Sequence, residues 1–167
     1  MDSFSAELNT LLTTTYRYIV KVEEAMLKNL SRDQLSISEM HMLESVGKGR
    51  GEGRSVTAIA QENGVTLPTV TMGINKLVKK GYVTKDRVEG DKRMVCVRLT
   101  DAGRRAETAH RFFHRQMVKA IGGAIREDEQ PTLLKSLLAM QEFLRKKVDE
   151  IEAHQGIRIG PDGGQIT

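Results

Sequence analysis

The sequence predicts a mainly α-helical fold with one small β-hairpin, a combination that belongs to the α+β class. Three long segments, residues 8–26, 102–121 and 133–151, repeat apolar residues at spacings of three and four, the period of an amphipathic helix. Between the first and the second of them the elements are short and end at glycines. The chain has 167 residues, 39% of them apolar, which is enough for one compact unit with a hydrophobic core.

The N-terminal part is predicted to form two helices. The first has about seven turns and one apolar seam, formed by Leu8, Leu12, Thr15, Ile19, Val22 and Met26. Residues 36–39 (SISE) then match a capping box, so we expect a second helix from there to about Val46. Residues 47–54 (GKGRGEGR) hold four glycines but lack the Gly-Lys-Ser/Thr ending of a phosphate-binding loop, and we expect a flexible connector.

The middle of the chain is predicted to hold two short helices and a hairpin. A helix over 56–62 ends at a glycine turn, and Thr66 is placed to cap a second helix with Pro68 in its first turn. Two strands, 82–87 and 94–99, follow and are joined by the loop 88–93. We therefore expect a helix-turn-helix module with a β-hairpin wing over residues 35–100.

The C-terminal part is predicted to form two more helices. Thr100 and Asp101 are placed to cap a long helix that ends near Gly122, and Asp128 with Pro131 is placed to open the last one. Residues 154–167 contain four glycines and one proline without any period, so we expect a flexible tail there.

The positive charge is concentrated on the predicted winged module. The whole chain carries a net charge of only +4, from 26 basic and 22 acidic residues. Between residues 54 and 100, however, the chain has nine basic residues and only four acidic ones. The basic residues are Arg54, Lys76, Lys79, Lys80, Lys85, Arg87, Lys92, Arg93 and Arg98. A basic patch that coincides with a helix-turn-helix favours binding to double-stranded DNA.

The second helix of the module has the pattern of a recognition helix. A helical wheel places Val70, Ile74, Leu77 and Val78 on one side, leaving a short, polar and basic opposite face. The expected DNA contacts of this helix are Thr66, Pro68, Thr69, Thr71, Met72, Asn75, Lys76 and Lys79. Thr69 and Asn75 are candidates for contacts to base edges or phosphates, and the lysines for contacts to phosphates.

The hairpin adds a second set of candidate DNA contacts. Arg93 is expected to enter a narrow minor groove, with Lys92 and Arg87 on the flanking phosphates. Asp91 is expected to orient Arg93, because a carboxylate that faced DNA would be repelled.

These motifs together resemble the MarR family of winged-helix regulators. The stretch over residues 55–103 contains the helix-turn-helix, its exit KLVKKGYV, the Asp-x-Arg of the wing at Asp91 and Arg93, and the closing Leu99, Thr100 and Gly103. The resemblance implies an obligate homodimer with an N-terminal dimerisation helix over 1–34 and C-terminal dimerisation helices over 101–153. It also implies two recognition helices on half-sites about 34–36 Å apart in a pseudo-palindromic operator.

A narrower resemblance covers most of the chain. The segments ISEMHMLESVGK (37–48), VTLPTVTMGINKLVKKGY (65–82) and RFFHRQMV (111–118) are similar to the FabT-type repressors of fatty-acid biosynthesis. This resemblance implies regulation by a long acyl chain on acyl carrier protein, bound in a channel between the DNA-binding lobe and the dimer helices. The candidate pocket residues are Met40, His41, Glu44, His110, Phe113, His114 and Met117.

Two other signals remain open as alternatives for regulation. The first is a phenolic or other small aromatic compound, as in other members of the MarR family. The second is a metal, since His110 and His114 lie four apart on one helix, with His41 and Glu107 as further candidates. The sequence places no cysteine or carboxylate cluster beside these histidines, so we expect neither a metal site nor a cofactor. Cys96 is expected to be a small wing side chain and not a redox switch.

The remaining function classes are less compatible with the sequence. No Ser/Cys-His-acid set, apolar carboxylate pair or nucleotide loop is evident, so we expect no enzymatic activity. A protein-interaction module with a vestigial wing is the alternative from another class. One cysteine, no basic-apolar leader and no apolar run of about 20 residues favour a cytoplasmic protein without a membrane partner.

Overall fold

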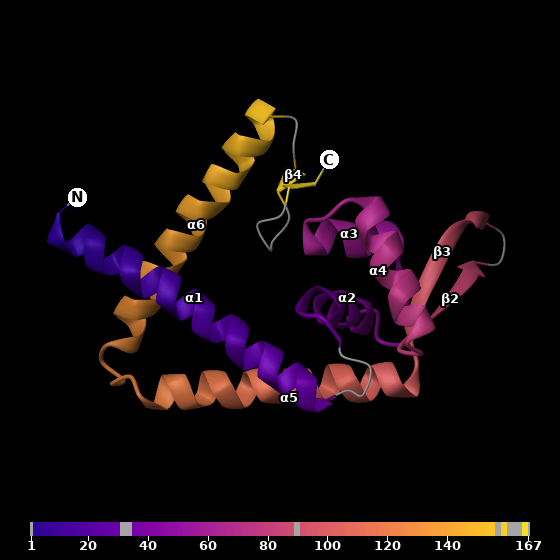
Figure 1. The fold of residues 1–167 in the computed structure, drawn as a ribbon, viewed down its shortest axis with the longest axis horizontal. Coiled ribbons are helices and arrows are strands. Elements are labelled where there is room, and N and C mark those ends of the chain that lie inside the picture. The colour runs from indigo at the N-terminus through magenta and orange to yellow at the C-terminus, as the bar shows by residue number, and fades with distance from the viewer. Residues whose placement is uncertain (1, 31–34, 89–90, 156–157, 160–164, 167) are drawn as a thin grey trace.

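A computed structural model of the chain describes residues 2–30, 35–88, 91–155, 158–159 and 165–166 (Figure 1). The elements follow in the order α1 (Ser3–Leu30), α2 (Ile37–Gly47), β1 (Arg54–Ser55), α3 (Val56–Asn63), α4 (Leu67–Lys79), β2 (Val83–Val88), β3 (Asp91–Leu99), α5 (Asp101–Gly123), α6 (Gln130–Gln155), β4 (Arg158–Ile159) and β5 (Gln165–Ile166). The predicted α+β class is confirmed, with helices dominating beside a three-stranded antiparallel sheet and a two-stranded pair, β4 with β5.

Helix starts are set by local side chains that satisfy the first backbone N–H groups. Ser36 Oγ accepts from Glu39 N at 3.1 Å, and the Glu39 carboxylate accepts from Ser36 N at 2.9 Å, which completes the predicted capping box of α2. Thr66 and Thr100 cap α4 and α5 through their hydroxyl oxygens, which accept from the backbone N–H groups of Thr69 and Gly103. Between α3 and α4, Gly64 adopts the left-handed conformation with φ of 62°, which permits the tight turn.

The wing is a three-stranded antiparallel sheet in the order β1-β3-β2. β1 was not predicted, because two residues are too few to show an alternating pattern; Arg54 pairs with Val97 and Ser55 with Cys96. The predicted loop 88–93 is also wrong, since β2 continues to Val88 and β3 begins at Asp91. Asp91 pairs with Val88 after a register shift, so 91–93 are strand positions and not loop positions.

The hydrophobic core lies inside the lobe formed by α2, α3, α4 and the sheet. Its fully buried apolar side chains are Met40, Leu43, Val46, Ile59, Val70, Ile74, Leu77, Val83 and Val97. Val78 was predicted to face this core, but it is 39% exposed in the last turn of α4, one residue before the helix ends. The lobe is therefore packed by three of the four apolar residues predicted on that helix.

The long helices extend away from the lobe. In Figure 1 the N-terminal half of α1 and most of α6 lie on the side opposite the β2–β3 hairpin. Asp2 accepts hydrogen bonds from Ser5 at the start of α1. α6 begins at Gln130, two residues after the predicted Asp128, whose carboxylate pairs with Arg126. No helix among the described residues is both long enough and apolar enough to cross a membrane.

The C-terminal segment contains more regular structure than the predicted flexible tail. α6 continues to Gln155, two residues beyond the predicted boundary at 153. β4 then pairs with β5, with Arg158 opposite Ile166 and Ile159 opposite Gln165. This pairing was not predicted, because each strand has only two residues and the surrounding sequence is rich in glycine.

Candidate functional site

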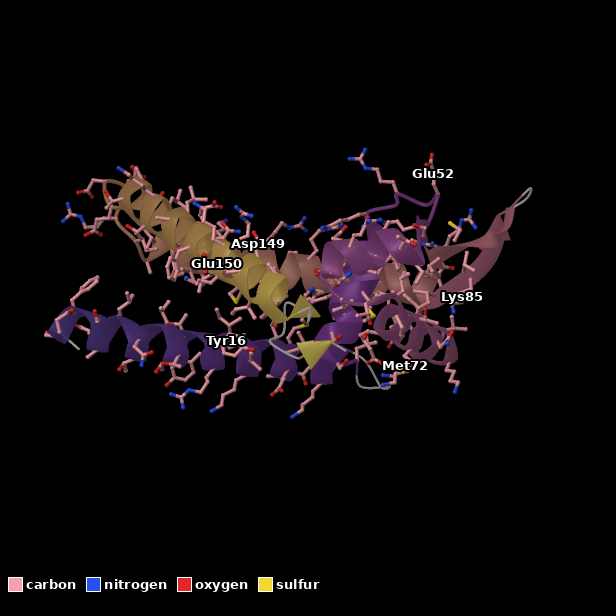
Figure 2. The ribbon with its side chains drawn as sticks, turned by 90° about the horizontal axis from the view of Figure 1, so that it is seen from above. Tyr16, Glu52, Met72, Lys85, Asp149 and Glu150 are labelled. Atoms are coloured by element: carbon pink, nitrogen blue, oxygen red, sulfur yellow. The ribbon has the colours of Figure 1, made fainter. Side chains whose placement is uncertain are left out.

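The exposed face of α4 carries half of the twelve residues predicted to contact DNA. Four positions on the opposite face, Val70, Gly73, Ile74 and Leu77, are buried against the lobe. The predicted contacts that are exposed on this helix are Pro68, Thr71, Met72, Asn75, Lys76 and Lys79, and the apolar Leu67 and Val78 are also exposed. Figure 2 shows Met72 projecting from the lobe on the side opposite Glu52, which lies in the glycine-rich loop. The helix thus presents one short, polar and basic surface.

Thr66 and Thr69 are used at the start of α4. Their hydroxyl oxygens lie 2.9 Å apart, and Thr66 Oγ1 also accepts from the Thr69 backbone N–H. Thr69 is half-buried as a result of this position. Thr66 is therefore the N-cap of α4, and its contacts with Thr69 hold the first turn of the helix in place.

Lys85 is a member of this surface that the predicted contact set omitted. Its Nζ donates a hydrogen bond to Asn75 Oδ1 at 2.6 Å, which joins β2 to the exposed face of α4. No sequence spacing relates these two residues, because the contact depends on how the hairpin folds against the helix. The side chains of Arg87, Asp91, Lys92 and Arg93 lie outside the described part of the structure, although their backbones belong to β2 and β3.

Part of the basic excess is neutralised by ion pairs in the lobe and on the hairpin. Arg54 donates to the carbonyl and hydroxyl oxygens of Ser45 and pairs with Glu62, which Lys48 also contacts at 2.6 Å. Lys80 pairs with Glu39 at 2.7 Å, and Arg98 pairs with Asp86 at 2.7 Å. Among the described residues, no carboxylate pairs with Lys76 or Lys79, so their charges remain directed to solvent.

The predicted pocket residues fall into three groups: the apolar Met40, Phe113 and Met117; then His41; and finally the polar set of Glu44, His110 and His114. Met40 is fully buried in the lobe core, while Phe113 borders a shallow hollow with Val22 and Met26 of α1. Met117 is half-buried on the next turn of α5. His41 lines a groove of about 770 Å³ between α1 and α2. Its other lining residues are Tyr16, Ile19, Val20, Glu23, Glu24, Leu27, Lys28, Leu35, Ser36, Ile37 and Ser38.

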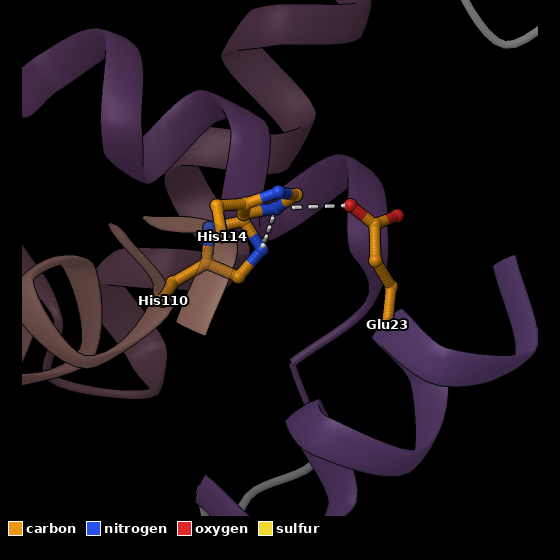
Figure 3. A group of neighbouring side chains, drawn as sticks. All are labelled: Glu23, His110 and His114. Atoms are coloured by element: carbon orange, nitrogen blue, oxygen red, sulfur yellow. Dashed lines mark hydrogen bonds and ion pairs between the residues drawn. The ribbon is translucent and has the colours of Figure 1, made fainter. Parts of the chain in front are cut away.

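The third group forms a polar chain that crosses three helices. His110 Nδ1 on α5 donates to Glu44 Oε1 on α2 at 2.6 Å, and His110 Nε2 lies 3.2 Å from His114 Nε2. His114 Nε2 in turn lies 3.1 Å from Oε1 of Glu23 on α1 (Figure 3). Glu23 was not predicted, because a lone glutamate on an amphipathic helix carries no signal of what will pack against it.

In this series of polar contacts, two ionisable side chains are buried. His110 is 1% exposed and Glu23 is 7% exposed. Burial by itself raises the pKa of the Glu44 carboxyl, but the hydrogen bond and charge of His110, with smaller contributions from His41 and His114, hold that pKa below its ordinary value. Glu107, the carboxylate suggested by the sequence, pairs with Arg111 at 2.6 Å instead.

Sequence comparison finds similar proteins among transcriptional regulators. A sequence profile described as the MarR family matches residues 33–94. The uncharacterized regulator YhjH of Bacillus subtilis is 33% identical over 86 residues, a match covering 52% of this chain and 48% of YhjH. The chain thus spans about half the length of that curated relative.

Solved structures extend the similarity over most of the chain. FabT of Streptococcus pneumoniae, crystallised in complex with DNA, is 34% identical with a TM-score of 0.78, covering 85% of this chain and 98% of FabT. The DNA complex of Staphylococcus aureus MepR superposes with a TM-score of 0.64 at 20% identity, covering 80% of this chain and 97% of MepR. The second likeness concerns the fold alone.

Proposed function

We propose that this chain, which belongs to the MarR family of winged-helix transcriptional regulators, is a homodimeric repressor that binds a pseudo-palindromic DNA operator. The observation that carries the proposal is the similarity to FabT, whose structure was solved with DNA, over 98% of the FabT chain. The exposed polar face of α4, with Lys76 and Lys79 free of carboxylate partners among the described residues, supports the same role. Such a surface is suited to the major groove.

The apolar surface of the long helices supports a homodimer. On α1 the exposed apolar side chains are Phe4, Leu8, Leu11, Leu12, Tyr16, Tyr18, Ile19 and Val22. On α6 they are Leu133, Leu134, Leu137, Leu138, Phe143, Leu144, Val148 and Ile151. Stripes of this length are costly to leave in water, and a second copy of the chain would cover them.

For the signal we propose a long-chain acyl group carried on acyl carrier protein, with fatty-acid biosynthesis genes as the targets. The support is the similarity to FabT together with the groove between α1 and α2, whose wall includes Ile19, Val20, Leu27 and Leu35. An acyl chain in this groove would touch a dimer helix on one side and a lobe helix on the other. Its binding would shift the population between two lobe spacings and so change operator affinity.

The test is fluorescence anisotropy with labelled duplexes from upstream of the chain's own operon and of fatty-acid biosynthesis genes. We expect saturable binding that weakens steeply with salt and is not matched by a scrambled duplex. Absence of binding, or binding that ignores salt, would contradict the DNA proposal.

The acyl proposal is tested separately by repeating the titration with long-chain acyl carrier protein. The matched control is the same carrier protein without an acyl chain. We expect a change in operator affinity only with the acylated form, and equal affinity with both forms would reject an acyl signal while leaving DNA binding intact.

A further inference from the structure

We propose that Glu23, His110 and His114 form a binding site for a divalent transition metal of the zinc class at the junction of α1, α5 and α2. One ligand atom from each residue, a carboxylate oxygen or an imidazole nitrogen, lies within 4.8 Å of the other two. Figure 3 shows the three side chains turned toward one another from two helices. The metal proposal does not rest on the acyl or DNA proposals, although Glu23 also lines the groove proposed for the acyl chain.

The spacing of the ligand atoms fits a tetrahedral ion. With metal–ligand bonds of about 2.0–2.1 Å, neighbouring ligand atoms of tetrahedral zinc stand about 3.3 Å apart. The two Nε2 atoms of the histidines lie 3.2 Å apart, and His114 Nε2 lies 3.1 Å from Glu23 Oε1. These separations need only small adjustments of the side chains to surround an ion.

The hydrogen bond at the far side of His110 prepares its Nε2 for a metal. Because Nδ1 donates to Glu44 Oε1 at 2.6 Å, the proton of a neutral His110 is on Nδ1 and the lone pair is on Nε2. A carboxylate that holds a ligating histidine in this way is typical of metal sites, where it fixes the ring and raises the basicity of the ligand. Glu44 is thus a positioning residue.

Charge and burial also favour a cation. Glu23 is 7% exposed, and its only described ionic partner is His114, without a lysine or arginine. In a neutral pair one proton on His114 Nε2 serves both His110 Nε2 and Glu23 Oε1, so a divalent ion would replace that proton with stronger bonds. With two neutral imidazoles, the charges of Glu23 and Glu44 balance a dication.

The ligand atoms determine which class of metal fits the site, and the neighbouring groove gives the metal a route to it. Two imidazoles and one carboxylate suit zinc and its neighbours, whereas calcium and magnesium prefer oxygen ligands. Glu23 also lines the groove between α1 and α2, so a hydrated ion can reach the site and keep a water in its fourth position. The bound ion would tie α1 to α5, which Glu44 already joins to α2.

The experiment measures binding to the metal-free full-length protein. After equilibrium dialysis against buffered Zn²⁺, elemental analysis should find one ion per chain, and Co²⁺ should give the strong visible absorption of a tetrahedral site. Mg²⁺ should not compete. Substoichiometric zinc, or Co²⁺ with only the weak spectrum of an octahedral ion, would overturn the proposal.

Variants assign the ligands. Glu23→Gln and His114→Gln should each weaken zinc binding by more than about a hundredfold, and Glu44→Gln by about tenfold to a hundredfold. The matched control is Glu24→Gln, the adjacent and exposed glutamate on α1, which should bind zinc like the wild type. Thermal unfolding separates binding from folding: zinc should raise the Tm of the wild type and of Glu24→Gln but not of Glu23→Gln. Equal zinc affinity in Glu23→Gln and Glu24→Gln would reject the site.

Discussion

Lys85 Nζ on β2 donates to Asn75 Oδ1 on α4 across 2.6 Å, and this contact holds the amide of an exposed α4 residue in one orientation. With Oδ1 occupied, the Asn75 NH₂ group is left as a donor toward solvent. Asparagine reads adenine by using both of its amide atoms, so in the proposed DNA complex the contact would restrict which base edges Asn75 can bind. Lys85 itself adds a positive charge beside the helix.

Lys85→Ala should therefore change both the strength and the selectivity of DNA binding. We expect weaker operator binding, a salt dependence reduced by about one phosphate contact per protomer, and a changed base preference where Asn75 docks. The measurement is anisotropy at several salt concentrations with single-base operator variants. Lys48→Ala is the control, because Lys48 pairs with Glu62 in the lobe and should leave the salt slope unaltered.

Substitutions of two residues on the same face of α4, Lys79 and Asn75, should separate the affinity for DNA from its sequence specificity. Lys79→Ala should weaken binding to all duplexes alike and reduce the salt slope, because a lysine contacts phosphates. Asn75→Ala should lower discrimination between operator variants by about 1–3 kcal/mol at one position with a smaller effect on nonspecific binding. Identical specificity profiles for the two variants would contradict the assigned roles.

The Glu39–Lys80 ion pair should make stability depend on pH. Burial raises the pKa of Glu39, but the hydrogen bond and charge of Lys80 and the Ser36 N–H lower it more, so the folded-state pKa lies below the ordinary 4.5. Its stabilisation is thus present above pH 4.5 and is lost as pH falls through the folded-state pKa.

Glu39→Gln keeps a residue suited to the capping box while removing the charge. Urea unfolding should show the variant less stable than the wild type near neutral pH, with the difference shrinking in acid. A difference in the free energy of unfolding that stays constant with pH would argue against a role for the ion pair.

Gly103→Ala should disrupt the junction of the wing and α5. A Cβ at this position would overlap the carbonyl oxygen of Tyr82, which accepts from Thr100 N at 3.0 Å, so the backbone would have to move. We expect a loss of about 1–3 kcal/mol or more, as for other overpacked sites. Gly122→Ala, which meets open space on the same helix, should be neutral or stabilising by up to about 1 kcal/mol. Chemical denaturation of the two variants compares them directly.

Features that depend on neighbours in the sequence were predicted well. Ser36, Thr66 and Thr100 cap their helices because each reaches a backbone N–H only three residues ahead. The buried face of α4 also follows from spacing alone, apart from Val78 at its edge. Short strands such as β1 escaped prediction because their partners are distant: Arg54 pairs with Val97.

The sequence by itself determined the helical class, the helix-turn-helix with its wing, and the basic character of one face, because periodicity and capping are local properties of the chain. Only the tertiary structure decided which charges serve that face, since Arg54 and Lys80 turn inward while Lys85 meets Asn75. It also brought Glu23 to His114 and Glu44 to His110. Those pairs join different helices, and no spacing along one helix reveals which carboxylate packing will place beside a histidine.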